Sequence, residues 1–460
     1  MKFGLITLGC DKNTVDSERY VADLVDRGAE YTAELDEAEV ILVNTCGFID
    51  TAKRESIDAL VEAGRRKSAG SCRAVVAVGC LVERHRQELA EALPEVDLFL
   101  GASDVHTLIP ALAERGMIGE SLVPHPGVRL YTGQLPHVRY LKISEGCDHG
   151  CAFCAIPLMR GKHRSFDLAE IVREAQLLEM QGARELNLVA QDLAHYGRDL
   201  RGGPKLPDLL EALIAESGIP WLRLLYLYSA GMTPRLLELM AREPRVLPYL
   251  DMPIQHAADR VLERMRRPER KHTIREKVLR AREVLPDVAI RTTCIVGFPG
   301  ETQSDFEELL DFLEDVRFER VGAFAYSPQE GTRAAALPDD VPDAVKLERL
   351  ERLADVQGPI SAERYERHLG RTVRVLVDRV ADTGVEGRTV WQADDVDGIT
   401  RVAGSVPTSS FVDVMLEDVM DDVDYTGRLV RVDSAPPRGA ARPGRALPVV
   451  AGIARGSYGR

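Results

Sequence analysis

Three cysteines lie close together near the start of the central region of this 460-residue chain. They are Cys147, Cys151 and Cys154, in the sequence Cys-Asp-His-Gly-Cys-Ala-Phe-Cys. Zinc sites favour paired C-x2-C elements with two further ligands, and His149 inside this tight loop is awkwardly placed to join such a set. Iron-sulfur clusters usually take four cysteines. The loop therefore predicts a 4Fe-4S cluster with one iron left open for another ligand, and a structural zinc site is the alternative.

Three further cysteines, Cys10, Cys46 and Cys80, each follow a segment with the pattern of a β-strand. The strands are expected at residues 3–8, 40–43 and 74–78, and helical patterns follow them at residues 14–27, 49–66 and 82–93. Alternating strands and helices predict a parallel sheet, whose carboxyl ends lie at one edge, where ligands bind. We therefore expect these cysteines to converge as a second three-cysteine site. The alternative is that each is a small buried residue of the core.

The two remaining cysteines are not expected to bind metal. Cys72 follows the polar stretch 67–71, and Cys294 lies in the apolar strand pattern 290–296. The isolated histidines His163, His195 and His256 are given no catalytic role.

The strand and helix patterns divide the chain into three domains and a tail. Residues 1–130 form the first domain, which ends with a fourth strand at 98–101 and a linker at 123–127. Residues 136–362 contain about six strand-helix units and predict a parallel partial barrel, with its chemistry at the carboxyl ends of the strands. Those strands are expected at 138–143, 185–189, 222–227, 249–252, 289–296 and 320–325.

The C-terminal part is expected to be a small β-barrel followed by a tail. Strand patterns without long helices occur at residues 372–377, 411–416 and 427–432, which gives a third domain at 366–432. Residues 433–460 predict a flexible tail that is basic, since five arginines and no acidic residue follow Asp433.

Composition narrows the location and the partners of the protein. The net charge of -14 argues against general nucleic-acid binding. No apolar run has the length of a membrane span, and the first ten residues resemble a strand more than a signal peptide. We therefore expect a cytoplasmic protein that does not bind membranes, in a reducing compartment where clustered thiols bind metal more often than they form disulfides.

The cysteine loop, with Phe153 before its last cysteine, resembles that of the radical S-adenosylmethionine enzymes. Together with the three N-terminal cysteines and the small C-terminal β-domain, called TRAM in this family, it resembles the methylthiotransferases over residues 1 to about 432. Three segments are similar to the RimO branch rather than to the branch that modifies tRNA: Gly-Cys-Asp-Lys-Asn-Thr-Val-Asp-Ser-Glu at 9–18, Cys-Ala-Ile-Pro-Leu-Met-Arg-Gly at 154–161 and Asp-Met-Pro-Ile-Gln-His at 251–256.

This resemblance implies an α/β fold: an N-terminal parallel-sheet domain, a central partial (β/α) barrel of the radical S-adenosylmethionine type and a TRAM-like β-barrel. It implies methylthiolation of the β-carbon of an aspartate in small-subunit ribosomal protein twelve, free or on the ribosome. The implied cofactors are two 4Fe-4S clusters and S-adenosylmethionine, with a flavodoxin or ferredoxin as electron donor. One S-adenosylmethionine would give a methyl group to sulfur at the N-terminal cluster, and a second would yield the radical that abstracts hydrogen. No catalytic side chain is assigned beyond the cluster ligands.

Four residues are candidate contacts for S-adenosylmethionine, each with a simpler alternative. Phe153 is expected either to pack on the adenine or to fill the core. Gln191 and Asp192, just after an expected strand, are expected either to hold the methionine amino group or to cap a helix. Gly297 opens a strand-to-helix turn that lets backbone approach a ligand.

The charge of the C-terminal domain distinguishes between two candidate substrates, a ribosomal protein and tRNA. Residues 371–433 carry thirteen acidic and seven basic side chains, whereas a tRNA-binding module should be basic. An acidic face suits a basic ribosomal protein, and the alternative is a merely solvated surface. The acids expected on this face include Asp394, Asp395, Asp397, Asp421 and Asp422. A tRNA adenosine methylthiotransferase is the nearest other function, and a non-catalytic two-cluster electron carrier or sensor is an alternative of another class.

Overall fold

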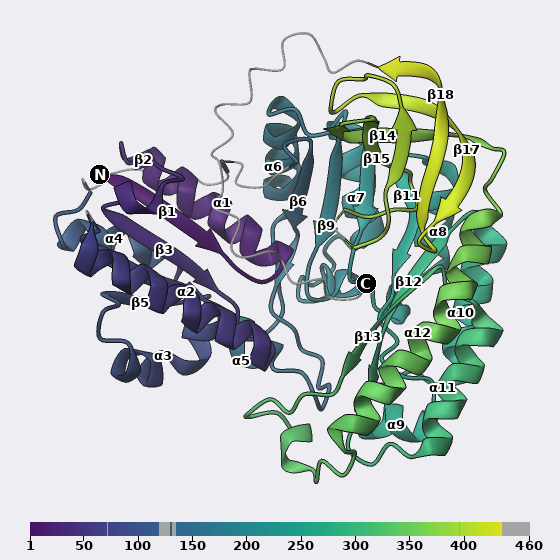
Figure 1. Cartoon of the computed structure of the whole chain (residues 1–460), viewed down its shortest axis with the longest axis horizontal. Coiled ribbons are helices and arrows are strands. Elements are labelled where there is room, and N and C mark those ends of the chain that lie inside the picture. The colour runs from purple at the N-terminus through teal and green to yellow at the C-terminus, as the bar shows by residue number, and fades with distance from the viewer. Residues whose placement is uncertain (71, 119–128, 131–134, 395, 435–460) are drawn as a thin grey trace.

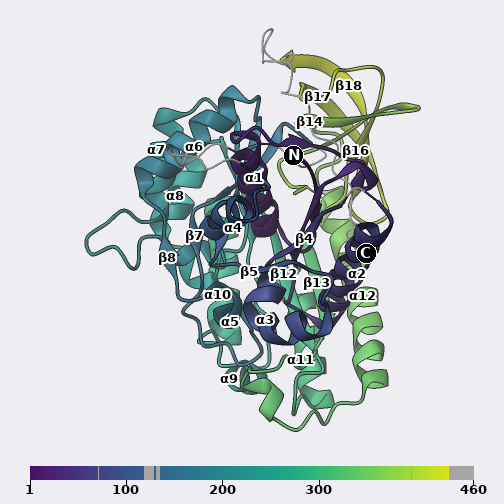
Figure 2. The same ribbon diagram turned by 90° about the vertical axis from the view of Figure 1, so that its left-hand side faces the viewer.

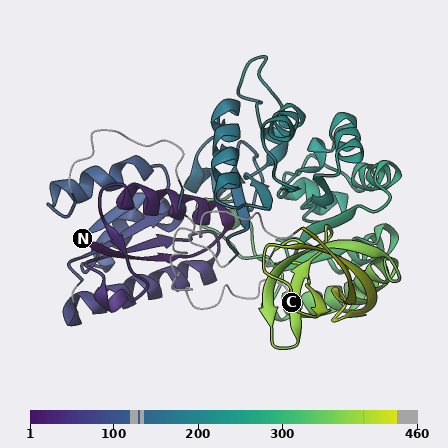
Figure 3. The ribbon, with the colours of Figure 1, turned by 90° about the horizontal axis from the view of Figure 1, so that it is seen from above.

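The computed structural model describes residues 1–70, 72–118, 129–130, 135–394 and 396–434 (Figure 1). The expected linker at 123–127 and nearly all of the expected tail lie outside these residues. Figures 1 and 3 show the N-terminal domain and the C-terminal barrel at different places against the central domain. Among the described residues, no helix has both the length and the apolar character that crossing a membrane requires.

The N-terminal domain is a parallel sheet in the order β2-β1-β3-β4-β5. Its strands are β1 (Lys2–Thr7), β2 (Glu30–Tyr31), β3 (Val40–Thr45), β4 (Ala74–Gly79) and β5 (Leu98–Gly101), and its α-helices are α1 (Asp11–Val25), α2 (Asp50–Ala69), α3 (Cys80–Ala92) and α4 (Leu108–Glu114). The predicted parallel sheet is confirmed. Strands β3 and β4 are buried along their whole length, as expected for a sheet covered on both faces.

The central domain is an open sheet of six parallel strands in the order β13-β12-β11-β10-β9-β6. The strands are β6 (Val138–Lys142), β9 (Glu185–Val189), β10 (Trp221–Leu224), β11 (Val246–Asp251), β12 (Ala289–Val296) and β13 (Arg320–Ala325). All six predicted strands are present, within three residues at each end. The short strands β7 (Ser144–Glu145) and β8 (Arg164–Ser165) pair beside the sheet.

Helices cover one face of this sheet (Figure 1). They are α6 (Leu168–Met180), α7 (Leu206–Glu216), α8 (Pro234–Arg242), α10 (Lys271–Val284), α11 (Gln303–Val316) and α12 (Asp343–Glu366), with the short helices α5 (Ile156–Arg160) and α9 (Asp259–Arg264) near the strand ends. Leucine side chains of these helices and strands form the largest apolar core of the molecule.

The C-terminal domain is a closed barrel in the order β14-β15-β16-β18-β17. Its strands are β14 (Thr372–Ala381), β15 (Gly384–Arg388), β16 (Thr400–Ala403), β17 (Phe411–Met420) and β18 (Asp424–Ser434). The sequence prediction missed β15 and β16, which are short, and β15 has two glycines in its five residues. Strand β18 ends at Ser434, so the first two residues of the expected tail belong to the barrel.

The C-terminal barrel shares a core with the central sheet. Trp221, Leu247 and Tyr249 of the sheet pack in one cluster with Val375 and Phe411 of the barrel. This contact corrects the choice of Asp397 as a surface acid: Asp397 is 6 % exposed and accepts a hydrogen bond of 2.6 Å from the Tyr249 hydroxyl. Its carboxylate also lies 3.8 Å from Nε of Arg291 and 4.0 Å from Nε of Arg320. Asp395 lies outside the described residues.

Candidate functional site

The three N-terminal cysteines lie at one edge of the first sheet, and two of them directly follow a glycine in a tight turn. Cys10 follows β1, Cys46 follows β3 and Cys80 begins α3 directly after β4, and these three strands are neighbours. Gly9, with φ +91°, lies so close to Cys46 that a Cβ on it would be 3.0 Å from the Cys46 sulfur. Gly79, with φ +99°, would place a Cβ 2.5 Å from the Asn44 side chain. Only glycine fits these two turns without strain.

Two asparagines hold these turns together. Nδ2 of Asn13 donates to the carbonyl oxygens of Leu8 (2.8 Å) and Thr45 (3.1 Å), so it joins the first two cysteine turns. Nδ2 of Asn44 donates to the carbonyl oxygen of Asn13 at 2.9 Å. Sequence reasoning did not single out either residue, although each lies within three residues of a predicted ligand.

The central cysteine loop follows β7 and lies between two backbone segments. The amide of Cys147 donates to the Gly161 carbonyl at 3.1 Å, and the amide of Ala152 donates to the Met265 carbonyl at 2.9 Å. The Cys151 sulfur lies 3.7 Å from the Tyr228 hydroxyl and 3.8 Å from Nη1 of Arg267. The Cys151 thiol thus lies near a cation and a phenol at the carboxyl end of the sheet.

Burial raises the pKa of two thiols in each set. It raises the pKa of Cys46 to about 12 and of Cys80 to about 11 in the first set. In the second set it raises the pKa of Cys147 to about 11 and of Cys154 to about 12. Each of these thiols is also affected by the charge of another cysteine of its own set. Buried thiols of this kind ionise when a positive centre offsets their burial, which is the donor chemistry that suits an iron-sulfur cluster.

The His149 ring is held by Asp192, His195 and Tyr228. Its Nε2 lies 2.8 Å from Oδ2 of Asp192, and its ring stacks between those of His195 (4.2 Å) and Tyr228 (4.1 Å). The ligand atoms of His149, Asp192 and His195 lie within 4.8 Å of one another. Two ligands of one zinc ion, each at about 2.1 Å, would lie more than about 3 Å apart. The 2.8 Å contact is therefore a hydrogen bond, and it favours the cluster interpretation over a zinc site that uses His149.

The expected contacts for S-adenosylmethionine have other partners in this structure. Oδ1 of Asp192 accepts hydrogen bonds from the amides of Ala194 (2.8 Å) and Tyr228 (3.1 Å), so Asp192 caps a short 3₁₀ helix. Nε2 of Gln191 donates to Glu145 at 3.0 Å.

The other two expected contacts lie in packed surroundings. Phe153 packs beside a cluster that includes Phe298 and Tyr326. Gly297, with φ +72°, lies where a Cβ would be 2.3 Å from Cγ of Lys346, so its turn approaches α12. Cys72 and Cys294 are both buried, and each belongs to an apolar core.

A buried polar network, which sequence reasoning missed, connects the first domain to the central one. Arg160 of α5 donates to Asp16 of α1 through Nη1 (2.7 Å), and Lys142 of β6 donates to the other oxygen of Asp16. Nζ of Lys142 also donates to Glu145 at 2.7 Å, and Nε of Arg160 donates to the Cys80 sulfur at 3.1 Å. Figure 2 shows the first domain in front of the central sheet. The network contacts Cys80 of the first set, and its residues Glu145 and Arg160 flank the central cysteine loop in sequence.

A second contact brings the start of α1 to the ends of β10 and β11. Nζ of Lys12 lies 3.1 Å from the centre of the Tyr226 ring, and burial lowers the pKa of Lys12. Tyr226 has φ +64°, which is rare for a bulky residue, and its amide donates to Asp251 at 3.1 Å. This strained residue lies at the carboxyl edge of the sheet, where functional residues are expected.

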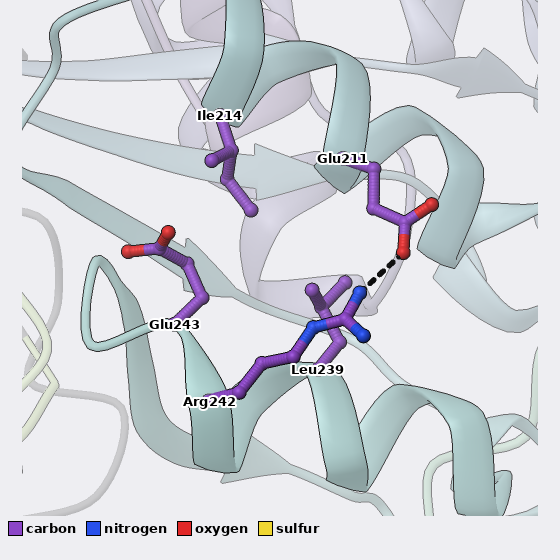
Figure 4. Close-up of a pocket in the computed structure, with 5 residues that line it drawn as sticks. All are labelled: Glu211, Ile214, Leu239, Arg242 and Glu243. Atoms are coloured by element: carbon purple, nitrogen blue, oxygen red, sulfur yellow. Dashed lines mark hydrogen bonds and ion pairs between the residues drawn. The ribbon is translucent and has the colours of Figure 1, made fainter.

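A shallow depression of about 290 Å³ lies elsewhere, between α7 and α8 (Figure 4). It is lined by Glu211, Ile214, Leu239, Arg242 and Glu243, and Glu211 accepts a hydrogen bond of 2.6 Å from Arg242. No cysteine lines it, and it lies on the helices that cover the outer face of the sheet. It has no connection to the chemistry of the cysteine sites.

Comparison with known proteins identifies all three domains. Residues 2–101 match the model of the uncharacterized protein family UPF0004, residues 141–313 match the radical SAM superfamily and residues 369–430 match the TRAM domain. The ribosomal protein uS12 methylthiotransferase RimO of Anaeromyxobacter sp. (strain K) is 45% identical over 459 residues, which cover 98% of this chain and 97% of the relative. The chain belongs to the RimO family.

A second RimO relative, from Desulforudis audaxviator, is 46% identical over 409 residues, covering 86% of this chain and 90% of the relative. Among solved structures, the radical S-adenosylmethionine methyltransferase TsrM from Kitasatospora setae has a TM-score of 0.51 at 12% identity. The match covers 71% of this chain and 73% of that one, and it supports the fold alone. As a radical SAM protein of the RimO family, the chain uses a 4Fe-4S cluster and S-adenosylmethionine.

Asp16 should make the contact between the first two domains sensitive to acid. Burial would raise the pKa of Asp16, but Lys142 and Arg160 outweigh it and lower the pKa from 3.8 to about 2. Because this folded-state pKa lies below the unfolded value, the stabilisation is present above about pH 4 and is lost as the pH falls towards about 2. Urea denaturation of the metal-free chain measures this effect. Between about pH 4 and about pH 2, the free energy of unfolding should fall by about 2 kcal/mol less in Asp16→Asn than in the parent.

The exposed acid Asp58 provides the control. Asp58→Asn should keep the pH dependence of the parent. The same pH dependence in Asp16→Asn as in the parent would show that Asp16 is not held ionised by its two cations.

Proposed function

We propose that this chain attaches a methylthio group to ribosomal protein uS12, at the β-carbon of an aspartate, by radical S-adenosylmethionine chemistry. The observation that carries the proposal is the 45% identity to a RimO enzyme over nearly the whole chain, in a chain that itself has two sets of three cysteines. The polar network that contacts Cys80 and flanks the central cysteine loop in sequence supports it, because sulfur and radical chemistry must meet at one substrate carbon.

Each set of cysteines is proposed to hold one 4Fe-4S cluster. Cys147, Cys151 and Cys154 would bind the cluster that meets S-adenosylmethionine, and the second cluster would be bound by the N-terminal set, which consists of Cys10, Cys46 and Cys80. When bound, these cofactors supply the electron transfer, the radical and the methylthio group, while the protein supplies orientation and exclusion of water. A flavodoxin or ferredoxin is the proposed electron donor.

The chain's own residues would orient S-adenosylmethionine at the carboxyl edge of the central sheet. Phe153 and Gly297 are proposed to contact it from the cysteine loop and the end of β12. Gln191 and Asp192 are proposed to face its methionine part, with Asp192 fixed by the 3₁₀ helix that it caps. Tyr228 and Arg267, which lie beside the Cys151 sulfur, would shield the site, since the guanidinium lies 3.7 Å from the Tyr228 ring centre.

Iron analysis tests the two-cluster proposal. After anaerobic reconstitution, the parent chain should contain about eight iron atoms and eight sulfides. Replacing Cys147, Cys151 and Cys154 together by Ala should leave about four of each, because the N-terminal set remains. The double variant Cys72→Ser, Cys294→Ser is the control and should keep them all. Full iron content in the triple variant, or loss of iron in the control, would contradict the ligand assignment.

The acidic C-terminal barrel is proposed to attract uS12. The end of β17 and the turn that follows it carry the exposed acids Asp418, Asp421 and Asp422. Asp421 and Asp422 have φ +49° and +67°, and no ion pair links either one to a described residue. Exposed acids are individually weak attractors, but several together can set the rate and orientation of encounter with a basic protein.

Replacing these three acids by neutral residues should slow the modification of uS12. The triple variant Asp418→Asn, Asp421→Asn, Asp422→Asn uses asparagine because this residue tolerates positive φ. We expect slower methylthiolation of uS12 at low salt, a smaller salt dependence than in the parent and unchanged cleavage of S-adenosylmethionine without substrate. Mass spectrometry of uS12 and assay of 5′-deoxyadenosine provide the two measurements.

A matched control removes three exposed acids of α12, by Glu348→Gln, Glu351→Gln and Asp355→Asn. It changes the net charge equally and should modify uS12 like the parent. Equal slowing in both variants would assign the effect to net charge, and no slowing in either would leave the acidic turn as a solvated surface.

A further inference from the structure

Arg160 contacts a cysteine of the N-terminal set and lies just after the central cysteine loop in sequence. It ends α5, six residues after Cys154, so it belongs to the segment that carries the central cysteines. Its side chain crosses into the first domain, where Nε donates to the Cys80 sulfur at 3.1 Å. One side chain therefore connects a ligand of the N-terminal set to the loop of the other set.

Each nitrogen of this guanidinium has an acceptor. Besides the Cys80 sulfur, Nη1 donates to Asp16 (2.7 Å) and Glu145 (3.2 Å), and Nη2 donates to Oδ1 of Asn13. The Arg160 side chain is only 3 % exposed. A buried guanidinium is tolerated when its donors are all satisfied, and its orientation is then fixed by several partners at once.

Of the three N-terminal thiols, Cys80 is the one whose sulfur is most affected by a hydrogen-bond donor. Cys80 is buried, whereas Cys46 is half-buried and Cys10 is exposed. A hydrogen bond to a ligand sulfur counts for more where water cannot screen it. Hydrogen bonds to the sulfurs stabilise the more negative, reduced form of an iron-sulfur cluster, so they raise its reduction potential.

We infer that Arg160 is a positioning residue of the N-terminal site: it holds the Cys80 sulfur against the radical SAM domain and raises the reduction potential of the group bound by Cys10, Cys46 and Cys80. This inference rests on the second cluster of the proposed function. Arg160 thereby both aligns the two cysteine sites and sets the reduction potential of the N-terminal one.

The chain offers a closely matched control in Arg139. Its side chain is 1 % exposed, and Nη2 donates across the same domain contact to Glu18 at 3.1 Å. Nη1 of Arg139 also donates to Oε1 of Gln181 at 2.8 Å, and neither of these two hydrogen bonds is to a sulfur. Replacing Arg139 by Gln therefore weakens the domain contact without removing a donor to sulfur.

The test is a redox titration monitored by electron paramagnetic resonance. The full-length chain with Cys147, Cys151 and Cys154 replaced by Ala isolates the N-terminal cluster, and Arg160→Gln, Arg160→Lys and Arg139→Gln are added one at a time. We expect the midpoint potential to shift in the negative direction in Arg160→Gln, to shift less in Arg160→Lys, which keeps the charge, and to stay unchanged in Arg139→Gln.

Three outcomes would overturn the inference. These are an unchanged potential in Arg160→Gln, an equal shift in Arg139→Gln, and, if Arg160→Gln fails to bind iron, an unchanged potential in Arg160→Lys. Absence of a reducible cluster in the background chain itself, before any arginine is replaced, would instead contradict the second cluster of the proposed function.

Discussion

The buried charges between α1 and the central domain are the interaction on which the arrangement of the molecule depends. Asp16 receives hydrogen bonds from Lys142 and Arg160, and Glu18, two residues later in α1, receives one from Arg139. Taking such groups out of water is costly, and only the completed set of partners offsets that cost. Because the partners come from two domains, the charges are satisfied in one docking geometry, and this geometry brings the two sets of cysteines to the same interface.

In both the N-terminal and the central domain, the cysteines lie near the carboxyl ends of parallel strands. Each sheet is parallel, so its turns gather at one edge, and each set of cysteines occupies such an edge. Glycines at positive φ let the turns approach closely at Gly9 and Gly79, and a strained Tyr226 marks the facing edge of the central sheet. The C-terminal barrel binds through a different apolar core, around Trp221 and Phe411, so it can present charge without altering the cysteine sites.

Local patterns in the sequence were enough for much of this architecture. Apolar runs located the strands of both parallel sheets except the two-residue strand β2, and the spacing of Cys147, Cys151 and Cys154 indicated a cluster loop. Strands β15 and β16 escaped because short strands with glycine lack a clear alternation of apolar residues. Tertiary pairing of charges was also invisible: Asp16, Lys142 and Arg160 look like ordinary surface residues in sequence. Asp397 was misplaced for the same reason, since its buried partners Tyr249 and Arg291 are distant in the chain.

The central claim is that this chain, a member of the RimO family, methylthiolates uS12 on a carbon atom of an aspartate. Tandem mass spectrometry of uS12, incubated with the reconstituted chain, S-adenosylmethionine and a reductant, tests it most directly. The account predicts a mass increase of one methylthio group that fragmentation assigns to a single aspartate, and no such product with the variant that lacks Cys10, Cys46 and Cys80. Unmodified uS12 together with methylthiolated adenosine in tRNA treated in the same way would contradict it.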